Sequence, residues 1–224
     1  MPAIELLEQA CLTPQVSHFA FRAPFQHEAG QYVALSAPVG GTRQTRYYSI
    51  ASPPVSSGRI ELCIQHQGAF GSHLRSLREG DRMECSEPGG TMRLLDAGRP
   101  AVYFAAGTGV APMRAILLEQ LAANPEAEAI LLLGSRHASE LLFCNEFEEL
   151  AARHARFRFL PAVSGKEGGW GGRQGRVTAH IDEALAGLSS PDAYFCGQRE
   201  MVAQLRERLA AAGIPDERQV YERY

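Results

Sequence analysis

The segment AVYFAAGTGVAPMRAIL, residues 101–117, joins a short apolar run to a glycine-rich turn and then to a helical pattern. The run at 101–105 has the composition of a buried strand, and Pro112 suits the first turn of the helix that follows the turn at 107–109. Glycines let the backbone approach a ligand closely, and free N–H groups at a helix N-terminus can hold a pyrophosphate. The segment therefore predicts either a dinucleotide site or a plain strand-to-helix turn.

The turn departs from the common GxGxxG pattern. Pro112 stands where the last glycine would be, and the next predicted strand ends in Gly134-Ser135-Arg136 rather than in an acidic residue. Many NAD dehydrogenases place a carboxylate there for the ribose hydroxyls. Arg136 instead favours a coenzyme with a 2′-phosphate, because arginine offers paired donors. Three further basic residues follow in a neighbouring loop: Lys166, Arg173 and Arg176.

Outward from this segment, strand and helix patterns alternate to the end of the chain. The predicted strands and helices are as follows: strands at 101–105, 129–133, 157–161 and 192–196, and helices near 111–123, 144–154, 177–186 and 199–212. Strand, helix and strand in succession predict a parallel sheet with helices on its faces.

Before residue 98 the pattern is different. Short runs rich in β-branched and aromatic residues lie between turn clusters, at 16–22, 31–37, 46–51, 59–65 and 81–85, with one short helix near 70–77. Such runs predict a small antiparallel barrel or sandwich. We therefore expect two domains, 1–97 and 98–224, with a β-barrel followed by an α/β parallel-sheet domain.

Composition excludes several classes of protein. The 224 residues include 22 Lys and Arg and 25 Asp and Glu, which gives a net charge of −3. The chain therefore lacks the excess of positive charge that is typical of nucleic-acid-binding proteins. The longest apolar stretch, 101–113, is interrupted by glycine and proline and is shorter than the ~18 residues that indicate a membrane span. The N-terminal MPAIELLEQA carries acidic residues where a secretory signal needs positive charge. We expect a cytoplasmic protein that contacts neither nucleic acid nor membrane.

Cysteine and histidine spacing offers no metal site. The five cysteines form no CxxC pair and no iron–sulfur spacing, and the seven histidines form no HExxH motif. We expect no bound metal, so any electron chemistry must use another group.

Two segments of the first domain have the composition of ligand-binding sites. RYYS, residues 46–49, ends a predicted strand and places Arg46 and Tyr48 on one face. A guanidinium there can neutralise phosphate while the phenol ring stacks on a planar heterocycle. GAFGSHL, residues 68–74, is a glycine-rich entry to a short helix and a second possible phosphate cradle. Each segment alone is also compatible with an ordinary turn or packed strand.

Taken together and in order, these motifs resemble the ferredoxin–NADP reductase family, including its flavin reductase and oxygenase reductase members. RYYS is similar to the family's RxYS, GAFGSHL to its second flavin phosphate motif, and GTGVAP to its GTGxxP. CGQREM, residues 196–201, is similar to its CGxxxM, and the closing ERY to its terminal carboxylate–x–aromatic. The resemblance spans essentially the whole chain. It implies an FAD-binding antiparallel barrel followed by an NAD(P)-binding parallel sheet.

The resemblance also implies residue roles. Arg46 would neutralise the FAD pyrophosphate, Tyr48 would pack on the isoalloxazine, and the Ser49 hydroxyl would hydrogen-bond flavin N5. Cys196 and Glu222 would lie near the nicotinamide, and Tyr224 over the flavin where nicotinamide must enter. The implied phosphate-binding residues are Gly71 and Ser72 for FAD, and Gly107, Thr108 and Gly109 for the nicotinamide dinucleotide.

The activity implied is an FAD-dependent NAD(P)H:acceptor oxidoreductase. Hydride would pass from NADPH or NADH to FAD and electrons then to a separate soluble acceptor, a ferredoxin-type protein or free flavin, because no iron–sulfur domain is expected in this chain. One departure affects FAD adenine contacts: Met92 replaces the aromatic residue of the family's GPxGxF segment. The alternative is a non-catalytic flavin-binding sensor or regulatory subunit. We expect a monomer in either case.

Overall fold

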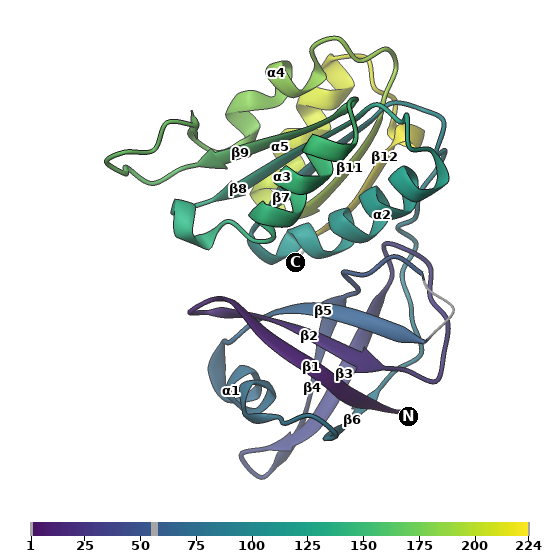
Figure 1. The fold of residues 1–224 in the computed structure, drawn as a ribbon, viewed down its shortest axis with the longest axis vertical. Coiled ribbons are helices and arrows are strands. Elements are labelled where there is room, and N and C mark those ends of the chain that lie inside the picture. The colour runs from purple at the N-terminus through teal and green to yellow at the C-terminus, as the bar shows by residue number, and fades with distance from the viewer. Residues whose placement is uncertain (1, 55–57, 224) are drawn as a thin grey trace.

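The computed structural model describes residues 2–54 and 58–223, which form two lobes stacked along the long axis of the molecule (Figure 1). The first lobe holds one six-stranded antiparallel sheet in the order β4-β3-β6-β1-β2-β5. A bridge between Ile50, directly after β4, and Leu62 of β5 links the two edges of this sheet, which closes it into a barrel. The elements are β1 (Ala3–Thr13), β2 (Val16–Arg22), β3 (Tyr32–Val39), β4 (Thr42–Ser49), β5 (Arg59–Gln65), α1 (Gly68–Ser76) and β6 (Arg82–Cys85). The predicted antiparallel barrel is confirmed.

Strand β1 was not among the strands predicted from the sequence. Its pairing with β2 shifts register between Leu6 and Glu8 and again between Cys11 and Thr13. Each irregularity interrupts the alternation of buried and exposed side chains that marks a half-buried strand. The sequence of β1 therefore shows no clean period of two.

The second lobe is a six-stranded sheet in the order β10-β9-β8-β7-β11-β12, and every pair in it is parallel. Its strands are β7 (Ala101–Ala106), β8 (Ala129–Ser135), β9 (Phe157–Val163), β10 (Arg173–Gln174), β11 (Asp192–Gly197) and β12 (Gln219–Arg223). Its α-helices are α2 (Val110–Ala123), α3 (Cys144–Arg153), α4 (Ile181–Leu185) and α5 (Arg199–Ala211). The predicted parallel sheet is confirmed, with β10 and β12 as additional edge strands.

Both faces of this sheet are covered by helices, which explains why its central strands are apolar without alternation. Tyr103 and Leu131 pack with α2 and α3 on one face, whereas Phe104 and Leu132 pack with α4 and α5 on the other. The predicted helix at 177–186 is divided into a 3₁₀ turn, Val177–His180, and α4.

The segment between the two sheets is fixed to the second lobe. The backbone N–H of Leu95 donates to the Tyr194 hydroxyl at 2.9 Å, and Arg99 Nη1 donates to both carboxylate oxygens of Asp192 at 2.9 and 3.0 Å. The first sheet ends at Cys85 and the second begins at Ala101, and the boundary at residue 97 stays a prediction. No helix within the described residues is long and apolar enough to cross a membrane.

Candidate active site

A cavity of about 900 Å³ lies between the two lobes. It brings Arg46, Tyr48 and Ser49 of the first lobe to one site with Thr108, Cys196 and Glu222 of the second. Its other lining residues are Tyr32, Tyr47, Cys63, Gln65, Gln67, Phe70, Ala111, Gln198 and Arg223. We call this space the flavin cavity. Neither lobe forms it alone, since each supplies one wall.

Strand β4 provides aromatic and basic side chains to the first-lobe wall of the flavin cavity. Arg46 and Tyr48 are two residues apart on β4, opposite Leu35 and Val33 of β3, as the alternation predicted. The guanidinium carbon of Arg46 lies 5.9 Å from the centre of the Phe70 ring at the start of α1. Burial raises the pKa of the Tyr48 phenol to about 12, and the nearby charge of Arg46 only partly offsets that rise. Tyr48 therefore presents a neutral ring at working pH.

The start of α1 is shaped as a backbone cradle. Its first residue, Gly68, has a φ of +63°, and Gln67, which precedes it, makes no side-chain hydrogen bond that would cap the helix. A Cβ on Gly71 would lie 2.8 Å from the carbonyl carbon of His66, so only glycine fits there. Ser72 donates from its hydroxyl to the Gly68 carbonyl at 3.1 Å. Gly71 and Ser72 belong to the helix behind Gln67 and Phe70 and are not themselves among the residues that line the cavity.

Cys196 and Glu222 form the opposite wall, on adjacent strands. They are direct partners in the parallel register of β11 and β12. Burial raises the pKa of the Cys196 thiol to about 12, with a smaller contribution from the charge of Glu222, and burial also raises the pKa of Glu222. A Cβ on Gly90 of the first lobe would lie 3.3 Å from Glu222 Oε1, so the carboxyl group reaches across the boundary. Tyr224, assigned to this site from the sequence, lies outside the described residues.

A second cavity, of about 420 Å³, opens beside the ends of β7 and β8. Gly107 and Thr108 line it, whereas Gly109 is buried and does not. Gly107 has a φ of +53°, a conformation that favours glycine, in the 3₁₀ turn that leads into α2. Thr108 lines both cavities, so the two spaces meet at this turn. We call the second space the coenzyme cavity.

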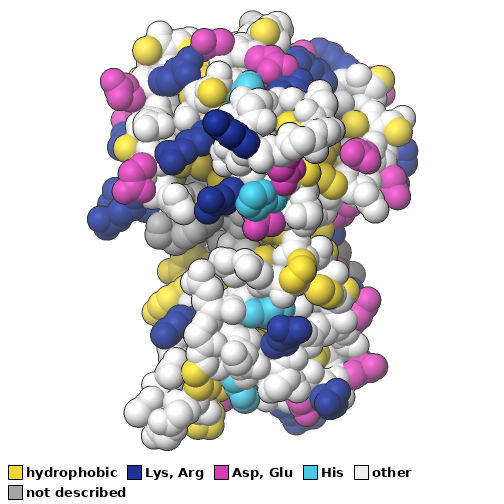
Figure 2. Space-filling view, turned by 90° about the vertical axis from the view of Figure 1, so that its left-hand side faces the viewer, with side chains coloured by type: hydrophobic (Ala, Val, Ile, Leu, Met, Phe, Trp, Pro, Cys, Tyr) yellow, Lys and Arg dark blue, Asp and Glu magenta, His cyan; other side chains and the backbone are white. Residues whose placement is uncertain are grey.

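Arg136 and Arg176 both line the coenzyme cavity. Within the described residues, neither guanidinium has a hydrogen-bond or ion-pair partner. Arg173 is bound to Glu183 on α4 and lies outside the lining, as does Lys166. Figure 2 shows Lys and Arg side chains on the upper lobe next to the boundary between the lobes.

Several lining residues were not predicted from the sequence. Cys63 and Gln65 stand two apart on β5, which puts both on the face toward the flavin cavity, and burial raises the pKa of Cys63 to about 12. Thr13, the last residue of β1, and Gln15, in the turn before β2, line the coenzyme cavity from the first lobe. Period-two alternation marks the β5 pair, but no sequence signal marks a contact between domains.

The residues of the flavin cavity fit a flavin dinucleotide. The cavity volume lies within the range of small-molecule sites, and its lining combines aromatic rings, two guanidiniums and the hydroxyls of Ser49 and Thr108. The uncapped N-terminus of α1, where Gln67 and Phe70 line the cavity, suits a pyrophosphate. The fold and site define a two-domain flavin-dependent NAD(P)H oxidoreductase.

Comparisons with known proteins agree with this class. Residues 3–94 match the oxidoreductase FAD-binding domain and residues 104–207 the oxidoreductase NAD-binding domain. The chain is 35% identical over 228 residues to ferredoxin–NADP reductase B of Sorangium cellulosum, covering 95% of this chain and 93% of that one. It is 32% identical to the reductase component DmpP of phenol 2-monooxygenase from Pseudomonas sp. strain CF600, covering 85% of this chain but 56% of that one.

A solved structure, the Amycolatopsis cytochrome P450 reductase GcoB, superposes with a TM-score of 0.88 at 29% identity, covering 99% of this chain and 69% of that one. The chain belongs to the ferredoxin–NADP reductase family. It is an enzyme that uses FAD and NAD(P)H, which removes the sensor alternative.

Proposed function

We propose that this enzyme takes hydride from NADPH and passes electrons to a separate protein of the ferredoxin type. The observation that carries the proposal is the flavin cavity, in which the Ser49 wall of one domain and the Cys196 and Glu222 wall of the other enclose one space. FAD, when bound, supplies a hydride acceptor that can release electrons singly or in pairs.

The chain's own residues hold and orient the reactants. Arg46 neutralises phosphate, Tyr48 offers its neutral ring to the flavin, and the Ser49 hydroxyl donates at N5. Thr108, Cys196 and Glu222 orient the nicotinamide from the opposite side.

Two guanidiniums that have no side-chain partner among the described residues support NADPH over NADH. Arg136 and Arg176 line the coenzyme cavity, and a 2′-phosphate would accept paired hydrogen bonds from either. The basic residue at 136 stands where a ribose-binding acid would suit NADH.

Two observations support a protein acceptor. The Sorangium relative is named for ferredoxin, and the Pseudomonas relative is a reductase component of a monooxygenase. Tyr47, which lines the flavin cavity, is 70% exposed and offers an apolar contact at the cavity mouth.

An acceptor panel tests this proposal. NADPH oxidation is measured with small iron–sulfur proteins and with free FMN and riboflavin at equal concentration. Faster turnover with an iron–sulfur protein at micromolar concentration supports the proposal. Turnover that rises only with free flavin would identify the enzyme as a flavin reductase.

A further inference from the structure

Arg114 of α2 is a buried charge at the boundary between the two domains. Its exposure is 9%, and the Phe143 ring lies 4.9 Å from the guanidinium carbon. Nε and Nη2 donate to the two carboxylate oxygens of Glu146 on α3, at 2.7 and 2.8 Å. Nη1 donates to the Ala51 carbonyl at 2.7 Å and to Glu61 Oε2 at 2.9 Å. One planar group therefore binds two helices of the second domain to two segments of the first.

The first-domain segment held by Arg114 is the one that positions Ser49. Ala51 lies two residues after Ser49, and its N–H donates to the Glu61 carbonyl at 2.7 Å. The Glu61 N–H in turn donates to the Ser52 hydroxyl at 3.1 Å. With the Ala51 carbonyl and the Glu61 carboxylate both bound to Arg114, the end of β4 has little freedom to move relative to α2.

In the second domain, residues next to Arg114 line the two cavities. Ala111, one helical turn before Arg114, lines the flavin cavity, and Thr108, just before α2, lines both cavities. The apolar cluster around Arg114 also crosses the boundary, since Ala51 and Cys63 pack in it with Ala111.

Glu61 carries full charge in this contact. Burial alone would raise its pKa, but His18, whose Nε2 lies 3.2 Å away, and the charges of Arg114 and Arg59 lower that pKa to about 2. Arginine stays protonated in proteins. Glu61 and Arg114 therefore form an ion pair across the domain boundary throughout the working pH range.

We propose that Arg114 is a positioning residue for hydride transfer, which fixes the separation of the Ser49 wall from the Cys196 wall. Reacting atoms must approach to about 3–3.5 Å, and a misplacement of 1 Å can cost about a hundredfold in rate. The inference rests on the proposed hydride transfer. It differs from a role confined to one domain because Ala51 and Glu61, which Arg114 binds, lie across the boundary from α2.

Glu61 and Glu146 are matched variants for the test, because both bind Arg114 but only Glu61 is in the other domain. The rate constant of flavin reduction at saturating NADPH is measured by stopped flow, and the coenzyme dissociation constant by titration with NADP⁺. For Glu61→Gln and Arg114→Lys we expect the rate constant to fall about tenfold or more with a dissociation constant changed less than about twofold. Glu146→Gln should keep the rate constant within about threefold. Equal losses in Glu61→Gln and Glu146→Gln, or an unchanged rate in Glu61→Gln, would overturn the proposal.

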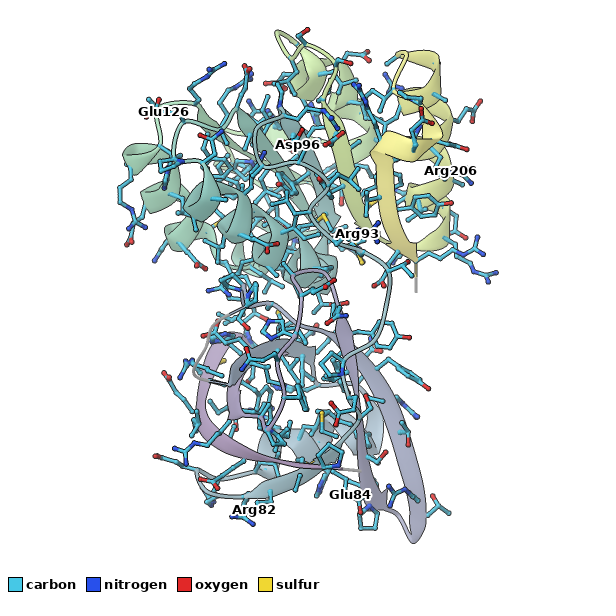
Figure 3. The ribbon with its side chains drawn as sticks, turned by 90° about the vertical axis from the view of Figure 1, so that its right-hand side faces the viewer. Arg82, Glu84, Arg93, Asp96, Glu126 and Arg206 are labelled. Carbon is cyan, nitrogen blue, oxygen red and sulfur yellow. The ribbon has the colours of Figure 1, made fainter. Side chains whose placement is uncertain are left out.

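A distance measurement gives a readout independent of activity. Spin labels on Arg82→Cys and Glu126→Cys, which lie on different lobes in Figure 3, report the separation of the domains in a Cys11→Ser background. We expect the distance distribution to broaden in Glu61→Gln and to stay narrow in Glu146→Gln. If Arg114→Lys does not fold, the isosteric Glu61→Gln carries the test. If NADPH fails to reduce the parent protein, the proposed function fails, and the distance distribution alone decides the role of Arg114.

Discussion

The flavin cavity and the coenzyme cavity share Thr108 but differ in the other groups that line them. The flavin cavity is lined by a neutral phenol, a hydroxyl, two thiols with raised pKa values, the half-buried carboxyl group of Glu222 and the guanidiniums of Arg46 and Arg223. The coenzyme cavity offers the guanidiniums of Arg136 and Arg176, which have no side-chain partner in the part of the chain that the structure describes, and the carboxylates of Glu140 and Glu200. Both cavities therefore hold arginines suited to phosphate, whereas the groups assigned to orient the reacting atoms, Ser49, Cys196 and Glu222, line only the flavin cavity. We expect substitutions of these groups to change rates and substitutions of the coenzyme-cavity arginines to change affinities.

The largest effect that we expect is on stability, at the domain boundary that both cavities share. The folded-state pKa of Glu61, about 2, is below the ordinary value of 4.5. Its ionised form therefore stabilises the fold above pH 4.5, and this contribution is lost as the pH falls from 4.5 through 2. The loss amounts to about 3 kcal/mol.

Urea unfolding between pH 2 and 7 measures this loss of unfolding free energy in the parent and in Glu61→Gln. We expect the variant to be less stable at pH 7 and to lose less stability in acid. If the free energy of unfolding depends on pH in the same way in the parent and in Glu61→Gln, the ionisation of Glu61 does not stabilise the fold.

The next effect should fall on the rate in the flavin cavity. Ser49→Ala removes the proposed donor at N5, and we expect flavin reduction to slow by about 10- to 100-fold, since a donor at a reacting atom acts chiefly in the transition state. Ser49→Thr keeps the hydroxyl and is the control. Stopped-flow reduction and circular dichroism separate a change in rate from a change in fold, and an unchanged rate in Ser49→Ala would reject the role.

Arg136→Ala should change affinity in the coenzyme cavity instead. We expect about tenfold weaker NADPH binding, the loss of one charge-assisted contact, with NADH binding within about twofold of the parent. Arg173→Ala is the matched control, because Arg173 binds Glu183 outside the cavity. An unaltered NADPH to NADH ratio of dissociation constants in Arg136→Ala would remove the 2′-phosphate assignment.

The smallest effect concerns the cradle at α1. Gly71→Ala places a methyl group 2.8 Å from the His66 backbone, and we expect a loss of about 1 kcal/mol in stability and weaker FAD retention. Gly168→Ala is the control, since a Cβ there meets nothing within 4 Å. Thermal unfolding and the flavin content of the purified protein report both quantities, which should match the parent only in Gly168→Ala.

The sequence predicted most of this architecture where local pattern determines structure. Apolar runs identified the central strands of the parallel sheet, and the glycine turn at 107–109 was found from its composition. Strand β1 was missed because its register shifts remove the period of two. The two-residue strand β10 is too short to show a pattern.

Contacts between the domains could not be predicted in the same way. Arg114 has the sequence context of any helical arginine, and only the packed structure brings it to Glu61 and Ala51. Thr13 and Gln15 reach the coenzyme cavity for the same reason. Such contacts depend on how the two domains pack against each other, and the local spacing of apolar residues carries no information about that packing.

The most direct test of hydride transfer across the flavin cavity is an anaerobic titration of the FAD-loaded protein with NADPH, followed by flavin absorbance. We expect stepwise bleaching that is complete at about one NADPH per FAD, as a two-electron hydride transfer requires. Coenzyme binding without bleaching would contradict it.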